Sequence, residues 1–143
     1  MRIGARRRID IFLNKDGLEE LETSLEAVDR LKFKDVQKYK DRLSDAQRKT
    51  GEKDALIAVA GNLKDIPVVV CAFEFAFNGG SMGYAVGEKF TRAAQMALDQ
   101  RRPIVLVFRE SPDHIRCINI NRREGEDFIL LWTQFFLQLL KIL

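Results

Sequence analysis

Cysteine and histidine are scarce in this sequence. Its 143 residues include two cysteines, Cys71 and Cys117, and a single histidine, His114. Two cysteines cannot form a four-cysteine zinc site and do not indicate a disulfide scaffold, so we expect a reducing, intracellular setting and no bound metal. His114 follows a Ser-Pro-Asp turn with no nucleophile near it in sequence, which favours an exposed turn residue over a general base. Cys71 falls in an apolar segment and is expected to be a small core residue.

A long apolar segment near the N-terminus and a strong net charge are also missing. The opening MRIGARRRIDIFLN contains arginines but no stretch apolar enough for a secretory signal, so a cytoplasmic location is expected. The net charge of +3 suits an anionic ligand without requiring nucleic acid. Apolar and charged fractions of 46% and 31% are typical of a globular chain, and the length allows one domain over residues 1–143.

The stretch that begins at Ile66 has an apolar segment followed by a glycine-rich turn. A strand is predicted from Ile66 to Phe77, where Glu74 is the only charged residue. In its last part phenylalanine alternates with Glu74 and Ala76, which would place Phe73, Phe75 and Phe77 on one face. Such a strand is expected to be buried on at least one side.

Six residues, Asn78 to Gly83, follow this strand and predict a sharp turn, because glycine has no Cβ and lets bare backbone approach a ligand. A helix is predicted next, from about Tyr84 to Gln100, with an apolar face made of Val86, Phe90, Ala93 and Ala97. A helix N-terminus behind a glycine turn favours negative charge, either a phosphate or an oxygen that becomes negative during a reaction. The same pattern also occurs as a structural turn that binds nothing, and the pattern alone leaves both interpretations open.

The remaining segments predict helices packed on a sheet. Two short N-terminal helices are expected, with a break at Asp16-Gly17 and Asp16 as the N-cap of the second. A helix from Lys38 to Lys49 is expected to end at Gly51. Further strands are predicted over Ala55–Ala60, Ile104–Phe108 and Ile115–Ile120, the first forming a hairpin with Ile66–Phe77 and the last a hairpin with Ile104–Phe108. Together these elements indicate an α/β layer.

Several motifs occur in an order that resembles one known family. They are Leu31-Lys32-Phe33-Lys34-Asp35, Tyr39-Lys40-Asp41-Arg42-Leu43, Lys49-Thr50-Gly51, Lys53-Asp54-Ala55-Leu56, Gly79-Gly80-Ser81-Met82-Gly83 and Val86-Gly87-Glu88-Lys89. From about Ala5 to about Phe108, the chain is similar to the beta subunit of the bacterial or plastid acetyl-CoA carboxylase carboxyltransferase. So many ordered matches are more specific than a single glycine motif.

The resemblance implies a crotonase-like α/β fold and a specific reaction. In that family a carboxyl group passes from carboxybiotin, held on a biotin carrier protein, to acetyl-CoA and gives malonyl-CoA for fatty-acid synthesis. An acyl-CoA ligand and a carboxyltransferase alpha subunit are the implied partners, with no cofactor bound directly by this chain. The plastid stroma would replace the cytoplasm if the source is a plant or an alga. The acyl-CoA-facing loop is assigned to Gly79, Gly80, Ser81, Met82 and Gly83, with Glu88 and Lys89 as supporting groups behind it.

The likeness ends at Phe108. The family continues there into a Ser-Gly-Gly-Ala-Arg turn, whereas this chain continues with Arg109-Glu110-Ser111-Pro112 and has no glycine pair afterwards. The family's zinc ribbon lies before the position that matches Ala5, and Asn78 and Tyr84 replace its usual methionine and serine. In the family, fixed hydrogen-bond donors stabilise the negative thioester oxygen, and the resemblance assigns this task to the missing turn. Losing one such donor typically lowers the rate about 10²–10³-fold. We therefore expect a truncated carboxyltransferase N-terminal domain, without a zinc ribbon or an assigned catalytic residue, that is inactive alone.

The basic segment from Arg30 to Lys53 has more than one interpretation. Interspersed acidic residues, among them Asp41 and Asp45, favour a solvated helix face. A position near the phosphates of an acyl-CoA is the functional alternative that the resemblance allows. Nucleic-acid binding would need a denser basic field or more aromatic residues than Phe33 and Tyr39, and we do not expect it.

Residues 109–143 are predicted to form a divergent hairpin followed by an apolar helix. The helix would run from Asp127 to Leu143, with its few polar residues mostly on one stripe. Since 17 residues are short for a membrane span, a buried or subunit-contact helix is favoured. An interfacial membrane helix and a changed reading frame are the alternatives. A contact helix would make this chain a non-catalytic interaction module, or would join two copies of it.

Overall fold

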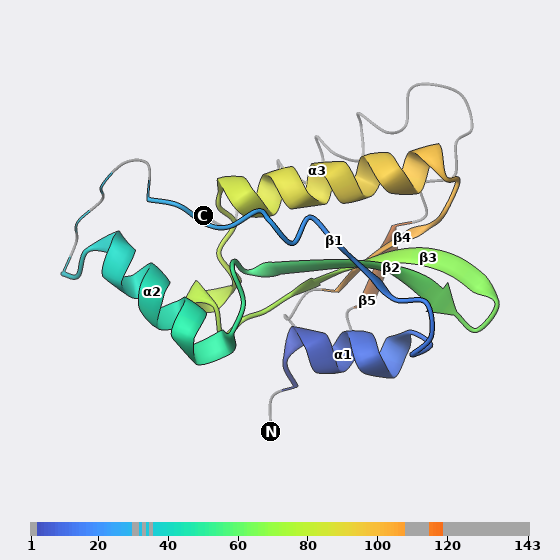
Figure 1. Ribbon diagram of the computed structural model, residues 1–143, viewed down its shortest axis with the longest axis horizontal. Helices are drawn as coiled ribbons and strands as arrows, with labels where there is room; N and C mark the ends of the chain where they lie inside the picture. The colour runs from blue at the N-terminus through green and yellow to red at the C-terminus, as the bar shows by residue number, and fades with distance from the viewer. Residues whose placement is uncertain (1–2, 30–31, 33, 35, 108–114, 119–143) are drawn as a thin grey trace.

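The computed structural model describes residues 3–29, 32, 34, 36–107 and 115–118. A sheet lies between helices α1 and α3, and helix α2 lies beyond one end of it (Figure 1). In chain order the described elements are α1 (Ala5–Phe12), β1 (Glu19–Leu21), α2 (Tyr39–Thr50), β2 (Leu56–Leu63), β3 (Ile66–Phe73), the short 3₁₀ helix η1 (Asn78–Gly80), α3 (Tyr84–Asp99), β4 (Ile104–Val107) and β5 (Ile115–Ile118). This is the mixed α/β architecture that the sequence indicates.

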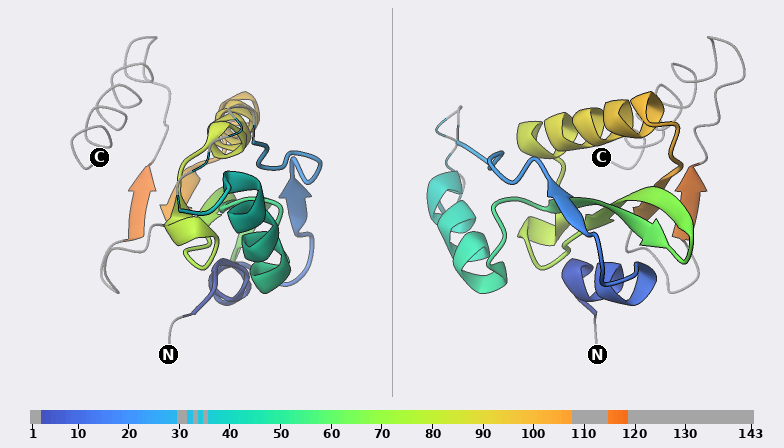
Figure 2. Two further views of the ribbon diagram at one scale, coloured as in Figure 1. Left: turned by 90° about the vertical axis from the view of Figure 1, so that its left-hand side faces the viewer. Right: turned by 45° about the vertical axis from the view of Figure 1, so that its right-hand side comes forward.

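The sheet has the strand order β1-β2-β3-β4-β5. Strands β2 and β3 form the expected antiparallel hairpin, in which Leu63 pairs with Ile66 across the turn. Strand β4 is parallel to β3, so β3, α3 and β4 form a β-α-β unit. Strand β5 pairs antiparallel with β4, which confirms the second predicted hairpin. Strands β1 and β5 occupy the two edges of the sheet (Figure 2).

Both faces of the central strands are buried, and each face packs against different helices. The face toward α3 includes Leu56, Val69, Cys71, Ile104 and Leu106, together with the helix residues Val86, Ala93 and Ala97. The face toward α1 includes Ile57, Val59, Val70 and Val105, together with Ala5 and Ile9. Two-sided burial explains why β2, β3 and β4 are nearly continuous apolar runs rather than alternating ones.

Helix α2 begins one residue after the predicted start and ends at the predicted glycine. Gly51 has φ +75°, the left-handed conformation of a helix C-cap, and its N–H donates to the carbonyl of Gln47 at 2.8 Å. Leu43 and Ala46 are buried and fix one side of the helix to the core. The other residues of α2 are exposed or half-buried.

Two predictions about local structure are wrong. The second N-terminal helix does not form: Glu19–Leu21 is edge strand β1, paired antiparallel with β2, and Asp16 lies in a turn without capping a helix. Strand β3 ends at Phe73, four residues before the predicted end. Phe75 is consequently 39% exposed, whereas Phe77 is 2% exposed, so these two rings do not share a face.

Several predictions fall outside the described residues. These are the exposed position of His114 and the apolar helix over residues 127–143, with the interaction module that depends on it. In the part of the chain that the structure describes, no helix has the length and apolar character needed to cross a membrane.

Candidate functional site

The turn between β3 and α3 is built on three successive residues with left-handed backbone. Asn78, Gly79 and Gly80 have φ values of +46°, +73° and +75°. Glycine adopts this region without a steric cost and asparagine tolerates it, which explains why Asn-Gly-Gly stands here. The buried Phe77 ring anchors the turn at its start, and the Phe77 carbonyl accepts the Gly80 N–H at 2.8 Å. The chain can thus reverse direction over very few residues.

Helix α3 starts immediately behind this turn with a bare N-terminus. Its N-cap residue is Gly83, which has no side chain to accept a hydrogen bond from the first-turn N–H groups, and no acidic residue occupies that turn. Ser81, Met82 and Gly83 are exposed, and a Cβ placed on Gly79 or Gly83 would meet no heavy atom within 4 Å. Within the described part of the chain, the turn is therefore open at Gly79 and at Gly83. The positive end of the helix dipole faces outward there.

Helix α1 shows the contrasting arrangement. Its first N–H group, that of Ala5, donates to Glu74 Oε2 at 2.7 Å, while the Ala76 N–H donates to Glu74 Oε1 at 3.0 Å. Glu74, the acidic residue of the predicted strand, thus satisfies one backbone N–H at the start of α1 and one in the segment that follows β3. The N-terminus of α3, by contrast, has no side-chain cap and no acidic residue in its first turn.

Lys89, a predicted supporting residue, lies under α3 and not at the surface. It is 5% exposed, and its Nζ lies 3.3 Å from Asp54 Oδ2 and donates to the carbonyl of Leu56 at 3.3 Å. Asp54 is 1% exposed, and its Oδ1 accepts the Leu56 N–H at 2.8 Å. Burial raises the pKa of the Asp54 carboxyl above its ordinary value, a shift that the Leu56 N–H and the Lys89 charge oppose. This ion pair joins the start of β2 to the second turn of α3.

The raised pKa of Asp54 predicts a pH dependence of stability. Because the folded state holds this proton more tightly than the unfolded state, the free energy of unfolding falls as the pH rises from about 4 through the folded pKa. Asp54→Asn keeps an acceptor for the Leu56 N–H but removes the titration. Urea unfolding of both proteins at a series of pH values should show this decline in the parent alone, and parallel profiles would contradict it.

Glu88, the other predicted supporting residue, faces a surface network. Its Oε1 accepts from Arg92 Nε at 2.8 Å, and Arg92 Nη1 lies 2.6 Å from Glu22 Oε2. Exposed pairs of this kind contribute little to stability. Glu88 and Lys89 therefore lie on different sides of α3, and Lys89 is the one that holds the helix to the sheet.

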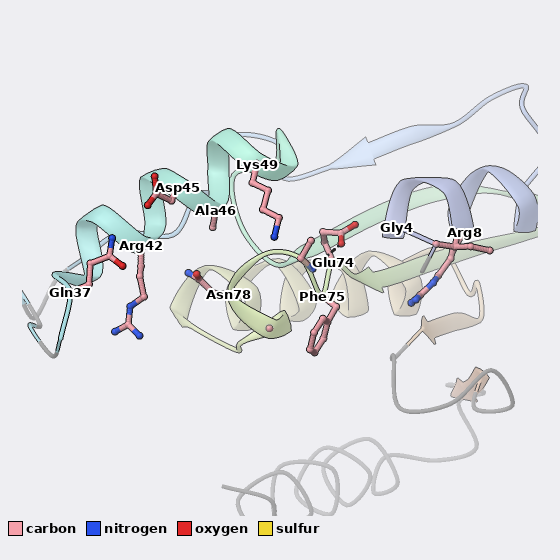
Figure 3. Close-up of a pocket in the computed structure, with 13 residues that line it drawn as sticks. Gly4, Arg8, Gln37, Arg42, Asp45, Ala46, Lys49, Glu74, Phe75 and Asn78 are labelled. Carbon is pink, nitrogen blue, oxygen red and sulfur yellow. Dashed lines mark hydrogen bonds between the residues drawn. The ribbon is translucent and has the colours of Figure 1, made fainter. Parts of the chain in front are cut away.

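An open hollow lies beside the glycine turn, between α1, α2 and the segment that follows β3 (Figure 3). Its volume is about 660 Å³. The charged residues of its wall are Arg8, Arg42, Asp45, Lys49 and Glu74, and Asn78 and Gly79 form the part of the turn that borders it. Of the predicted loop residues, Gly79 thus reaches the hollow, while Gly80, Ser81, Met82 and Gly83 lie outside its wall.

Sequence reasoning missed Arg8, Asp54 and the hollow itself. Arg42 and Lys49 carry a signal for the hollow, since a spacing of seven residues puts both on one face of a helix. No comparable sequence signal links Arg8 to Arg42 and Lys49, because α1 and α2 come together only in the folded chain. Asp54 is a single acidic residue ahead of an apolar strand, which does not reveal its partner.

Cys71 is fully buried in β3, as expected of a small core residue, and desolvation raises the pKa of its thiol to about 12. Within the described ranges, no cluster of three or more histidine, cysteine, aspartate or glutamate residues could hold a metal ion. Burial and the raised pKa thus give Cys71 a packing role in the core.

Comparison with known proteins shows a similarity of fold. No family model matches the sequence. A solved long-chain acyl-CoA carboxylase, a single-chain, multi-domain protein, matches 78% of this chain with 21% identity and a TM-score of 0.59. The geranyl-CoA carboxylase beta subunit of P. aeruginosa matches 73% of this chain with 22% identity and a TM-score of 0.49.

The chain spans 12% of the length of the first of these proteins and 17% of the second. The likeness therefore concerns part of a much larger molecule, and at this identity it extends to the fold alone. The described residues thus have a mixed α/β fold similar to part of an acyl-CoA carboxylase, in agreement with the crotonase-like fold expected from the sequence.

Proposed function

We propose that this chain is a divergent form of the acetyl-CoA carboxylase carboxyltransferase beta subunit and binds an acyl-CoA at the turn from Gly79 to Gly83. The observation that carries the proposal is the open glycine turn in front of an uncapped helix N-terminus. Backbone N–H groups with no competing side chain can meet a negative oxygen. The fold shared with a long-chain acyl-CoA carboxylase supports the same assignment.

The chemistry of the family explains why such groups matter. Carboxyl transfer to acetyl-CoA requires an enolate-like nucleophile, whose thioester oxygen carries negative charge that fixed donors stabilise. Carboxybiotin on a carrier protein would supply the carboxyl group, with an alpha subunit on the other side of the site. This sequence contains no Gly-Gly-Ala-Arg turn after Phe108. We therefore expect acyl-CoA binding without turnover by this polypeptide alone.

Gly83→Asp is expected to stabilise the fold and to abolish acyl-CoA binding. An aspartate at the N-cap accepts the first-turn N–H groups itself and adds a negative charge, which should contribute about 0.5–1 kcal/mol to stability. The backbone at Gly83 has φ −99°, which any residue adopts, and a Cβ there meets no atom within 4 Å. Calorimetric titration with acetyl-CoA and thermal unfolding measure the two effects.

Gly87→Ala is the matched control. Gly87 lies one turn further along α3, and a Cβ there also meets no atom within 4 Å. Alanine should stabilise the helix by about 0.5–1 kcal/mol without capping it, so acetyl-CoA binding should persist. The proposal fails if folded parent protein gives no heat with millimolar acetyl-CoA, or if both variants bind it equally.

A further inference from the structure

Glu74 joins two parts of the molecule that are far apart in the sequence. Its Oε2 accepts the N–H of Ala5, the first residue of α1, at 2.7 Å, and its Oε1 accepts the N–H of Ala76 at 3.0 Å. Ala76 lies between β3 and the glycine turn, whereas Ala5 is 69 positions away from Glu74. Figure 3 shows the Glu74 side chain between Gly4 and Asn78. One carboxylate thus connects α1 to the segment that leads into the turn, through hydrogen bonds of the strong, charge-assisted kind.

The backbone of Glu74 is held at the same place. Its N–H donates to the carbonyl of Ala55, just before β2, at 2.8 Å, and its carbonyl accepts the Phe77 N–H at 3.1 Å. The Phe77 carbonyl in turn accepts the Gly80 N–H at 2.8 Å. A continuous series of hydrogen bonds therefore runs from the first turn of α1 through Glu74 and Phe77 to Gly80.

Gly4, the N-cap residue of α1, leaves the space that the carboxylate occupies. A Cβ placed on Gly4 would lie 3.0 Å from Glu74 Oε2. The backbone of Gly4 has φ −66° and ψ 163°, which any residue adopts, so space and not backbone conformation favours glycine here. Since glycine cannot cap the helix with its own side chain, Glu74 supplies the acceptor for the first N–H group.

We propose that Glu74 is a positioning residue for the glycine turn, a role that rests on the proposed acyl-CoA binding there. From residue 74 to residue 83, all of them described, Phe77 is the only buried one. A segment with so few buried side chains opens locally unless hydrogen bonds hold it. By tying this segment to α1, Glu74 keeps the backbone N–H groups of the turn in one arrangement. Donors in a binding site must be held to within about 0.5 Å to be effective.

Glu74→Gln tests this role with almost no change of shape. An amide has one acceptor oxygen where the carboxylate has two, so glutamine can keep only one of the two backbone hydrogen bonds. The Gly80 amide should exchange its hydrogen about tenfold faster, and acetyl-CoA should bind about tenfold more weakly, which is the effect of losing roughly one hydrogen bond to a charged group. The Gly80 N–H keeps its own acceptor, the Phe77 carbonyl, so its exchange reports on the turn and not on the bond removed.

Gly4→Ala displaces the carboxylate without changing it. The added Cβ lies so close to Oε2 that the Glu74 side chain must shift by a few tenths of an ångström. Gly80 exchange and acetyl-CoA affinity should therefore change in the same direction as in Glu74→Gln, by a smaller factor. In a Glu74→Ala background the same substitution should have no further effect, because the carboxylate that it meets is gone.

Glu22→Gln is the matched control, because it removes the same charge from a carboxylate that pairs with a side chain. Glu22 Oε2 lies 2.6 Å from Arg92 Nη1 in an exposed pair. This variant should leave Gly80 exchange and acetyl-CoA affinity within about twofold of the parent.

Faster Gly80 exchange together with weaker acetyl-CoA binding, in Glu74→Gln and not in Glu22→Gln, supports the positioning role. Unchanged Gly80 exchange would overturn it, even if the buried amide of Val70 in β3 exchanges faster, since that shows a contribution to overall stability alone. Unchanged affinity, measured against a parent that binds acetyl-CoA, would overturn it too. If the parent binds no acetyl-CoA, the proposed function fails, and Gly80 exchange still decides whether Glu74 holds the turn.

Discussion

Replacing Lys89 by methionine is expected to lower the free energy of unfolding by about 3–5 kcal/mol. The Lys89 ammonium lies 3.3 Å from Asp54 Oδ2 in a site where the two residues are 5% and 1% exposed. Without it, Asp54 keeps only the Leu56 N–H as a hydrogen-bond donor and loses its countercharge. A buried carboxylate without a countercharge must either remain ionised at high cost or take up a proton. Urea unfolding at pH 7 measures the loss.

A double-mutant cycle distinguishes the ion pair from simple loss of packing. Asp54→Asn combined with Lys89→Met removes both charges, so the double variant should be much less destabilised than the sum of the two single variants. Arg48→Gln, which breaks an exposed pair with Asp45, should cost less than about 1 kcal/mol. Additive effects of Asp54→Asn and Lys89→Met would show that the two charges do not interact as the structure places them.

Phe77→Ala is expected to destabilise the protein by about 3–5 kcal/mol, the range for truncating a buried aromatic ring. Phe77 is 2% exposed and packs in the core on the α3 face of the sheet. Its backbone also holds the glycine turn, through the Glu74 carbonyl on one side and the Gly80 N–H on the other. The substitution should therefore loosen the turn as well as the core. Urea unfolding gives the first effect, and amide hydrogen exchange at Gly80 gives the second.

Phe75→Ala is the matched control for this substitution. Phe75 is 39% exposed and only two residues away, so its truncation should cost less than about 1.5 kcal/mol. The sequence alternation places both rings on one face and would predict similar costs. A loss of stability at Phe75 equal to that at Phe77 would support the alternation and contradict the structure.

The order of the central elements could be predicted from the sequence because their signals are local. Apolar runs bounded by turn residues predicted β2, β3 and β4, and the helical spacing of Val86, Ala93 and Ala97 predicted the buried face of α3. Gly51 marked the end of α2 because a left-handed C-cap strongly favours glycine. These features depend on neighbouring residues, so tertiary structure does not change them.

The errors have long-range causes. Glu19–Leu21 has apolar spacing compatible with a helix, but pairing with Ala58–Ala60 satisfies its backbone as a strand. Phe77 turns inward because the chain leaves the sheet after Phe73, which no alternation reveals. The ion pair between Asp54 and Lys89 joins residues 35 positions apart in the sequence. The hollow forms only where residues of α1 and α2 lie next to each other. Such contacts exist only once the chain has folded.

The loop from Gly79 to Gly83 depends on several of these contacts at once. Phe77 anchors its start, Gly79 and Gly80 give it the left-handed turn, and the Lys89–Asp54 pair fixes the helix behind it. Interactions on both sides thus hold an open segment in place. Such preorganisation is what a site needs if backbone donors are to meet a developing negative charge.

The most direct test of acyl-CoA binding follows the backbone amides of the turn by NMR while acetyl-CoA is added to the full chain. Our account predicts saturable shifts that are largest at the N–H groups from Gly79 to Val86 and that disappear in Gly83→Asp. Unchanged amide signals over these residues at millimolar acetyl-CoA, in protein whose spectrum shows that it is folded, would contradict it.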